Sequence, residues 1–108
     1  MSYEYPAEKF STARQALVAP HAQGDLVAVV TAFHECRLGL HRMNRSKLDQ
    51  TARGWIYALE CFMSTEGFSD AGGESAWDLK AKTLSAEQKS EIGRLIDELA
   101  RWFATNSL

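Results

Sequence analysis

Apolar residues recur at steps of three and four along four stretches of the chain, which is the spacing of one face of an α-helix. The stretches cover residues 6–18, 26–43, 47–63 and 86–103. Pro6 suits the first turn of a helix, and Pro20 with Gly24 is typical of the break that follows one. No stretch shows the strict alternation of a β-strand. The pattern therefore predicts an all-α protein.

The residues between these stretches indicate how the helices are connected. Ser46 and Asp49 have nearly the form of a capping box, which predicts a tight hairpin between the second and third helices. Ser85 and Gln88 have the same form at the start of the last helix. Residues 66–84 form one long connection, with a loop at 67–73 and a short helical turn whose Trp77 could plug an end of the fold. We expect a single domain over residues 1–108, an antiparallel bundle of about four helices.

Each predicted helix has an apolar stripe that should face the core. The stripes are Ala7, Phe10, Ala13, Leu17 and Val18; Leu26, Val29, Val30, Phe33, Cys36, Leu40 and Met43; Leu48, Ala52, Trp55, Ile56, Leu59, Phe62 and Met63; and Ile92, Leu95, Ile96, Leu99, Trp102 and Phe103. The last stripe is the most regular, and we expect Leu99 at its centre to be almost completely buried.

The third helix has a second face of small and apolar residues, which are Gly54, Tyr57, Ala58 and Cys61. A peripheral helix needs only one apolar face. The second face therefore indicates either a central helix in a monomer or a surface covered by a partner. Small residues permit close helix approach and tyrosine is enriched at interfaces, so we predict a homodimer or a protein partner at these four residues.

Arg37 lies within the apolar stripe of the second helix, and His34 and His41 lie along its edge. A buried guanidinium needs a carboxylate or a path to water. We expect an ion pair between helices, with Glu60 or an acid of the last helix. The alternative is a pocket for an anion or small molecule, possibly catalytic, formed by His34, Arg37 and His41.

The histidines do not form a recognisable metal motif. His34 and Glu35 begin the zinc motif H-E-x-x-H, but Leu38 stands where the second histidine is needed. His34 and His41 are about 10 Å apart along a helix, so one metal would require ligands from elsewhere, such as Glu60 or His21. We expect no metal, no cofactor and no catalytic residues.

Composition excludes several classes of protein. The 108 residues are 45% hydrophobic and 24% charged, which is typical of a globular domain. A net charge of −2 and a pI near 5.9 argue against a nucleic-acid partner, although residues 37–53 are locally basic. No apolar run is long enough for a membrane span, and two cysteines without a signal peptide indicate the cytoplasm. These features favour a non-catalytic helical interaction or regulatory module.

Overall fold

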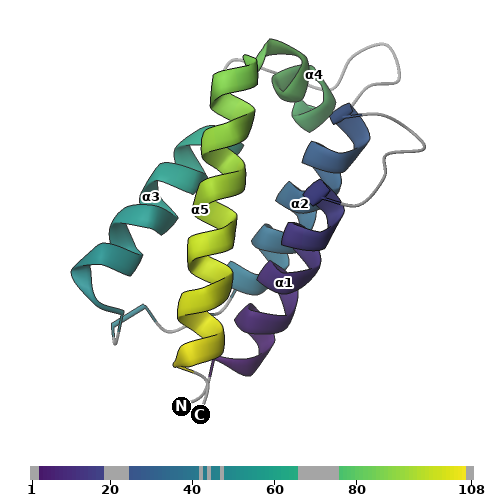
Figure 1. Ribbon diagram of the computed structural model, residues 1–108. Helices are drawn as coiled ribbons and strands as arrows, with labels where there is room; N and C mark the ends of the chain where they lie inside the picture. The colour runs from purple at the N-terminus through teal and green to yellow at the C-terminus, as the bar shows by residue number, and fades with distance from the viewer. Residues whose placement is uncertain are drawn as a thin grey trace.

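The computed structural model describes residues 3–18, 25–41, 43, 45–46, 48–65 and 76–106, with the side chains of 25 and 26 excepted. The helices in these residues are α1 (Glu4–Val18), α2 (Asp25–Leu40), α3 (Gln50–Met63), α4 (Ala76–Thr83) and α5 (Ala86–Thr105), as Figure 1 shows. No strand occurs in these ranges, so the all-α prediction is confirmed. The count is five helices rather than about four, because α4 is a helix in its own right.

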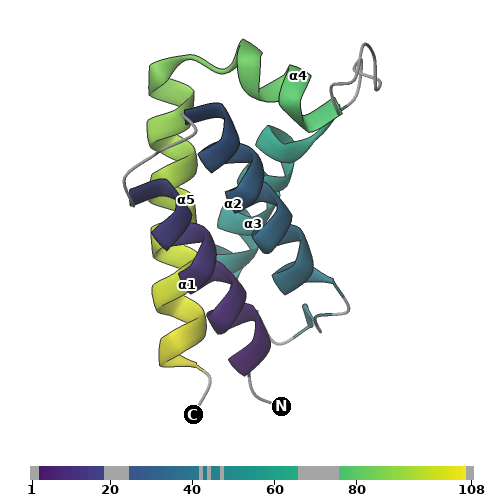
Figure 2. The ribbon, with the colours of Figure 1, turned by 90° about the vertical axis from the view of Figure 1, so that its right-hand side faces the viewer.

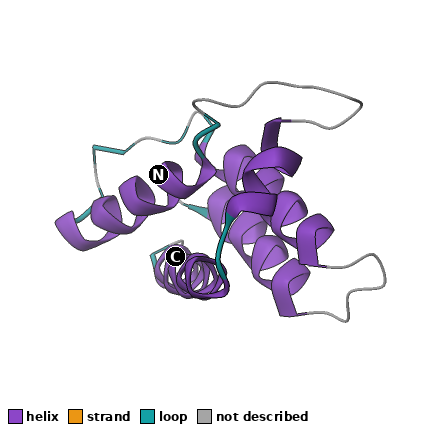
Figure 3. Cartoon of the chain, turned by 90° about the horizontal axis from the view of Figure 1, so that it is seen from above, coloured by secondary structure: helices purple, strands orange, loops and turns teal. Residues whose placement is uncertain are grey.

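The helices pack in a chain of pairwise contacts. α1 lies against both α2 and α5, α3 packs against α5, and α4 packs against α2 (Figure 2). Seen along the axis of α5, α3 is inclined to it (Figure 3). The simple four-helix antiparallel bundle is therefore not confirmed, since α3 is held mainly by α5 and α4 crosses the end of the molecule where α5 begins (Figure 1).

The core is built from the predicted stripes. Its largest completely enclosed side chains are Phe10, Phe33, Phe103, Ile56, Leu59, Ile92, Leu95, Ile96, Leu99 and Cys36. α5 contributes five of these ten, because this 20-residue helix packs against both α1 and α3. No polar or charged residue is buried among the described residues. The core is therefore held by apolar packing.

The start of α1 differs slightly from the prediction. The helix begins at Glu4, so Pro6 occupies its first turn rather than its first position. This is still tolerated because the first N–H groups of a helix have no partner within it. The predicted apolar stripe of α1 is wrong at Val18, which is 77% exposed. Leu17, the residue before it, is only partly buried.

The connection between α2 and α3 is longer than predicted. α2 ends at Leu40 rather than at 43, and α3 begins at Gln50 rather than at 47. Asp49, not Ser46, is the N-cap of α3, and its carboxylate accepts a hydrogen bond of 2.8 Å from the Ala52 N–H. The predicted tight hairpin is wrong because α3 packs on α5 instead of folding back on α2.

α4 and the start of α5 show one correction and one confirmation. The predicted short turn around Trp77 is an eight-residue helix. The predicted capping box of α5 is confirmed, since the Gln88 N–H donates to Ser85 Oγ at 3.1 Å and the Ser85 N–H donates to Gln88 Oε1 at 2.8 Å. The predicted loop at 67–73, together with Pro20, His21 and Gly24, lies outside the described residues.

Candidate functional site

The second face of α3 lies on the surface. Tyr57 is 72% exposed, and Gly54 and Cys61 beside it are also exposed. A Cβ atom added at Gly54 would have no atom within 4 Å, so nothing described here covers this position. Ala58 is the exception, because it is partly buried and packs against the core. Three of the four predicted interface residues are therefore left uncovered by the described parts of the chain.

Charged residues border this face on one side. Arg45 and Glu60 form a two-pronged ion pair, with Arg45 Nη1 and Nη2 donating to the two carboxylate oxygens at 3.0 and 2.9 Å. Arg53 Nη2 donates to the carbonyl oxygens of Arg45 and Ser46, each at 3.0 Å. The hydrogen bond to Glu60 raises the pKa of the Arg45 guanidinium above its usual value. Together these contacts fasten residues 45–46 onto α3.

Tyr57 also borders a groove of about 540 Å³ between α3 and the segment before it. Its lining residues are Arg45, Ser46, Leu48, Arg53, Ile56, Tyr57 and Glu60. The floor is apolar and the rim is charged. This combination is typical of a surface that contacts another macromolecule.

Arg37 is not in the core, and its predicted ion pair with Glu60 is wrong because Glu60 binds Arg45. Its guanidinium Cζ lies 5.7 Å from the centre of the Trp77 ring, an arrangement that is stabilising at exposed sites by about 0.5–1 kcal/mol. The His34 ring stands nearly perpendicular to the same indole, with a centroid distance of 6.4 Å. Both side chains thus hold α4 on α2.

Trp77 connects three helices at this point. Its ring packs 6.1 Å from that of Phe33 on α2, and its Nε1–H donates to the Met63 carbonyl at the end of α3 at 3.0 Å. His41 is exposed just beyond α2, and in the described part of the chain no hydrogen bond, ion pair or ring contact joins its side chain to His34 or Arg37. The structure therefore brings together two of the three residues predicted to bind an anion.

The two cysteines have very different surroundings. Cys36 is completely buried, and burial followed by the nearby charge of Glu35 raises the pKa of its thiol far above the usual range. Such a thiol is inert. Cys61 is free and exposed on the face of α3. In the described ranges, no cluster of three His, Cys, Asp or Glu residues is placed to hold a metal.

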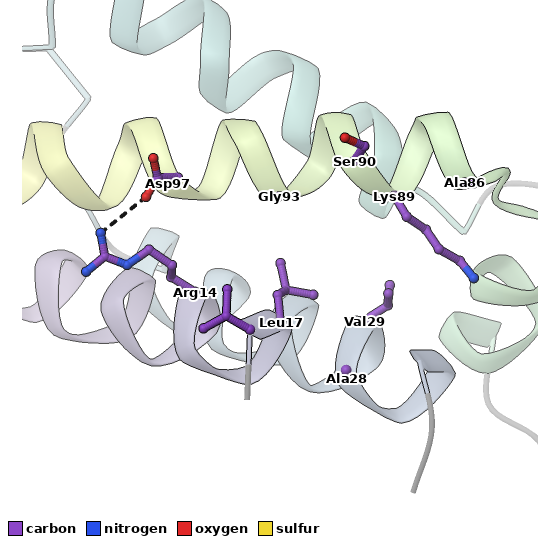
Figure 4. Close-up of a pocket in the computed structure, with 10 residues that line it drawn as sticks. Arg14, Leu17, Ala28, Val29, Ala86, Lys89, Ser90, Gly93 and Asp97 are labelled. Carbon is purple, nitrogen blue, oxygen red and sulfur yellow. Dashed lines mark hydrogen bonds and ion pairs between the residues drawn. The ribbon is translucent and has the colours of Figure 1, made fainter. Parts of the chain in front are cut away.

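A second feature lies between α1, α2 and α5, where the sequence indicated no site. It is a cavity of about 500 Å³, and Figure 4 shows its lining. The residues around it are Arg14, Leu17, Val18, Ala28, Val29, Ala86, Lys89, Ser90, Gly93 and Asp97. Gly93, a glycine in the middle of the most regular helix, was the one signal in the sequence that could have indicated this opening.

Comparison with known proteins gives no further guide to this site. No protein-family model matches the chain, and neither the curated proteins nor the solved structures include a match. None of the helices in the described segments is long and apolar enough to span a membrane.

Proposed function

We propose that this protein is a non-catalytic interaction module that self-associates, with two copies pairing through the exposed face of α3. The observation that carries the proposal is the 72% exposure of Tyr57 between two small residues, Gly54 and Cys61. A large amphipathic ring with small residues on one side of it is suited to fill the contact between two helices. The chain's two cysteines are free, which supports the expected cytoplasmic location.

The helical positions of these residues support a second copy as the partner. Successive residues turn by about 100°, so Gly54 and Cys61 lie to one side of Tyr57, and Arg53 and Glu60 lie to the other. A two-fold axis at Tyr57 reverses the helix direction but keeps each residue on its own side of the contact. Antiparallel pairing of α3 with its copy then places like sides together.

Pairing of this kind makes the face self-complementary. On one side Gly54 of one copy faces Cys61 of the other, so two small residues permit close approach. On the other side Arg53 of one copy faces Glu60 of the other, so opposite charges lie across the contact in addition to the Arg45–Glu60 pair within each copy. The two Tyr57 rings meet at the axis. Charge and size therefore both match a copy of the same surface, which is the requirement for a two-fold interface.

Sedimentation of Tyr57→Glu tests this proposal. The wild-type chain should sediment as a dimer at micromolar concentration. Tyr57→Glu should sediment as a monomer, because it would bury a carboxylate against its own copy at the axis. The variant should melt at the same temperature as the wild-type chain diluted to its monomeric form, since Tyr57 makes little contact with its own core. A wild-type chain that stays monomeric at high concentration would overturn the proposal.

Disulfide trapping tests the antiparallel geometry itself. Gly54→Cys should form an intermolecular disulfide with Cys61 of the second copy under mild oxidation, because the pairing brings these positions together. The added side chain fits, since the space beside Gly54 is open. Thr51→Cys is the matched control: Thr51 is exposed on the same helix but about 120° from Tyr57, so it should not crosslink. Equal crosslinking of both variants would contradict the arrangement.

The alternative function, an anion pocket at His34, Arg37 and His41, has weaker support. Trp77 already packs against His34 and Arg37. Their positions are accounted for by the attachment of α4.

A further inference from the structure

The cavity between α1, α2 and α5 has an apolar interior and charged ends (Figure 4). We propose that it binds an amphipathic anion, a medium-length alkyl chain ending in a carboxylate, with the carboxylate at Lys89. This function is separate from pairing through α3, because none of the residues of that face lines the cavity. A volume of about 500 Å³ is within the range of small-molecule sites.

The walls of the cavity provide the apolar part of the site. Leu17 of α1 and Ala28 and Val29 of α2 lie on one side of the cavity, and Gly93 of α5 lies opposite them (Figure 4). Val18 of α1 also lines the cavity. A Cβ atom at Gly93 would meet no other atom within 4 Å, so this glycine leaves the wall open. Val18 is 77% exposed at the edge of the cavity. An alkyl chain lying here would cover apolar surface that the fold leaves in water.

The charges at the two ends are not equivalent. At one end Arg14 Nη1 lies 3.2 Å from Asp97 Oδ1, and Arg101 Nη2 lies 2.7 Å from the other oxygen of the same carboxylate. Asp97 is therefore fully compensated. At the other end the Lys89 ammonium has no ion pair with any residue that the structure describes. Among the side chains that the structure describes, Lys89 is thus the lining cation without a carboxylate partner.

The start of α5 adds to the preference for an anion at that end. Ala86, the first residue of α5, lines the cavity together with Lys89. The N-terminal end of a helix carries partial positive charge, which favours a nearby anion. The charge of the side chain and that of the helix end therefore act in the same direction.

The spacing of the two ends sets the length of the ligand. Lys89 and Asp97 are separated by about 12 Å along α5, from the rise per residue of an α-helix. An extended alkyl chain of medium length fits between them, with its carboxylate at Lys89 and its methyl end near the Arg14–Asp97 pair. Decanoate is the corresponding simple probe.

The test compares three ligands that share one alkyl chain, namely decanoate, 1-decanol and decylammonium, each below its micelle concentration. Calorimetric titration of the wild-type chain should show saturable binding of decanoate, with about tenfold weaker binding of decylammonium. Lys89→Gln should weaken decanoate binding by about tenfold and leave decanol unchanged. The absence of saturable decanoate binding to the wild-type chain would overturn the proposal, and so would equal affinity for the acid and the amine.

A second variant locates the binding. Gly93→Leu places a side chain into the cavity, where the space is open, and should abolish binding of all three ligands. The circular dichroism spectrum of the variant is the control for folding and should match that of the wild-type chain. If Gly93→Leu is folded and still binds decanoate as the wild-type chain does, the ligand binds elsewhere and the assignment is wrong. If Gly93→Leu fails to fold, Lys89→Gln still decides the question, because a change at this partly exposed position should leave the fold intact.

Discussion

Leu99 lies at the centre of the apolar stripe of α5 and has no exposed surface. It shows what a single side chain contributes when a long amphipathic helix faces two others. Replacement of Leu99 by alanine should lower the free energy of unfolding by about 2–5 kcal/mol, because it removes buried methyl groups and leaves a cavity. Thr105→Ala on the exposed end of the same helix is the control and should stay within about 0.5 kcal/mol of wild type. Urea unfolding of both variants measures the difference.

Arg37 shows the opposite case, in which one residue's surroundings depend on a distant segment. Its position in the stripe of α2 predicts burial and an ion pair. In the structure it is exposed and lies over Trp77, forty residues later in the sequence. Helical spacing gives the direction of a side chain but does not tell which segment arrives to cover it.

At the scale of elements, α1 and α2 approach each other closely at Gly39. A Cβ atom there would lie 3.0 Å from Lys9 Cβ and 3.3 Å from two ring carbons of Phe10. Lys9 Cβ is bonded to the backbone and Phe10 is completely buried, so neither can move away without shifting α1. The glycine therefore sets the distance between the two helices.

Substitution at two glycines separates this packing effect from helix propensity. Alanine is favoured over glycine in a helix by about 1 kcal/mol. Gly39→Ala should nevertheless lower the free energy of unfolding by about 1–3 kcal/mol, because overpacking outweighs that gain. Gly93→Ala meets open space and should raise it by up to about 1 kcal/mol. Stabilisation by both substitutions in urea unfolding would show that α1 and α2 are not in close contact at Gly39.

At the scale of the whole molecule, the attachment of α3 to α5 depends in part on one carboxylate. One oxygen of Asp49 accepts from the Ala52 N–H at 2.8 Å, and the other accepts from Trp102 Nε1–H of α5 at 3.1 Å. The hydrogen bond from Ala52 and then that from Trp102 hold the pKa of Asp49 below its usual range. Asp49 thus starts α3 and also ties it to its neighbour.

A pH series with Asp49→Asn tests this link. Because the folded pKa is lowered, the stabilisation from Asp49 is fully present above the unfolded pKa of about 4 and is lost as the pH falls through the lower folded pKa. The wild-type chain should melt at a higher temperature than Asp49→Asn at pH 7, and the gap should narrow below about pH 4. The other carboxylates titrate in both proteins, so their effects cancel in the difference between the two melting temperatures. A gap that is constant with pH would contradict the assignment.

The sequence by itself determined the position of four of the five described helices, the capping box at Ser85 and Gln88, and most of the core stripe of each of these four. These features depend on neighbours three or four residues away, so they are encoded locally. The second face of α3 was also visible, since Gly54, Tyr57 and Cys61 lie outside the stripe that faces the core. That these residues are uncovered by the described parts of the chain became clear only from the structure.

Tertiary structure alone decided which helix lies against which. The N-cap of α3 is Asp49 and not the predicted Ser46. Trp102, fifty-three residues later, donates a hydrogen bond to the Asp49 carboxylate. The cavity between α1, α2 and α5 arises from the spaces around Gly93 and Val18, which neither residue encodes alone. Contacts of this kind join residues far apart in the chain, and the spacing of apolar positions contains no information about such pairs.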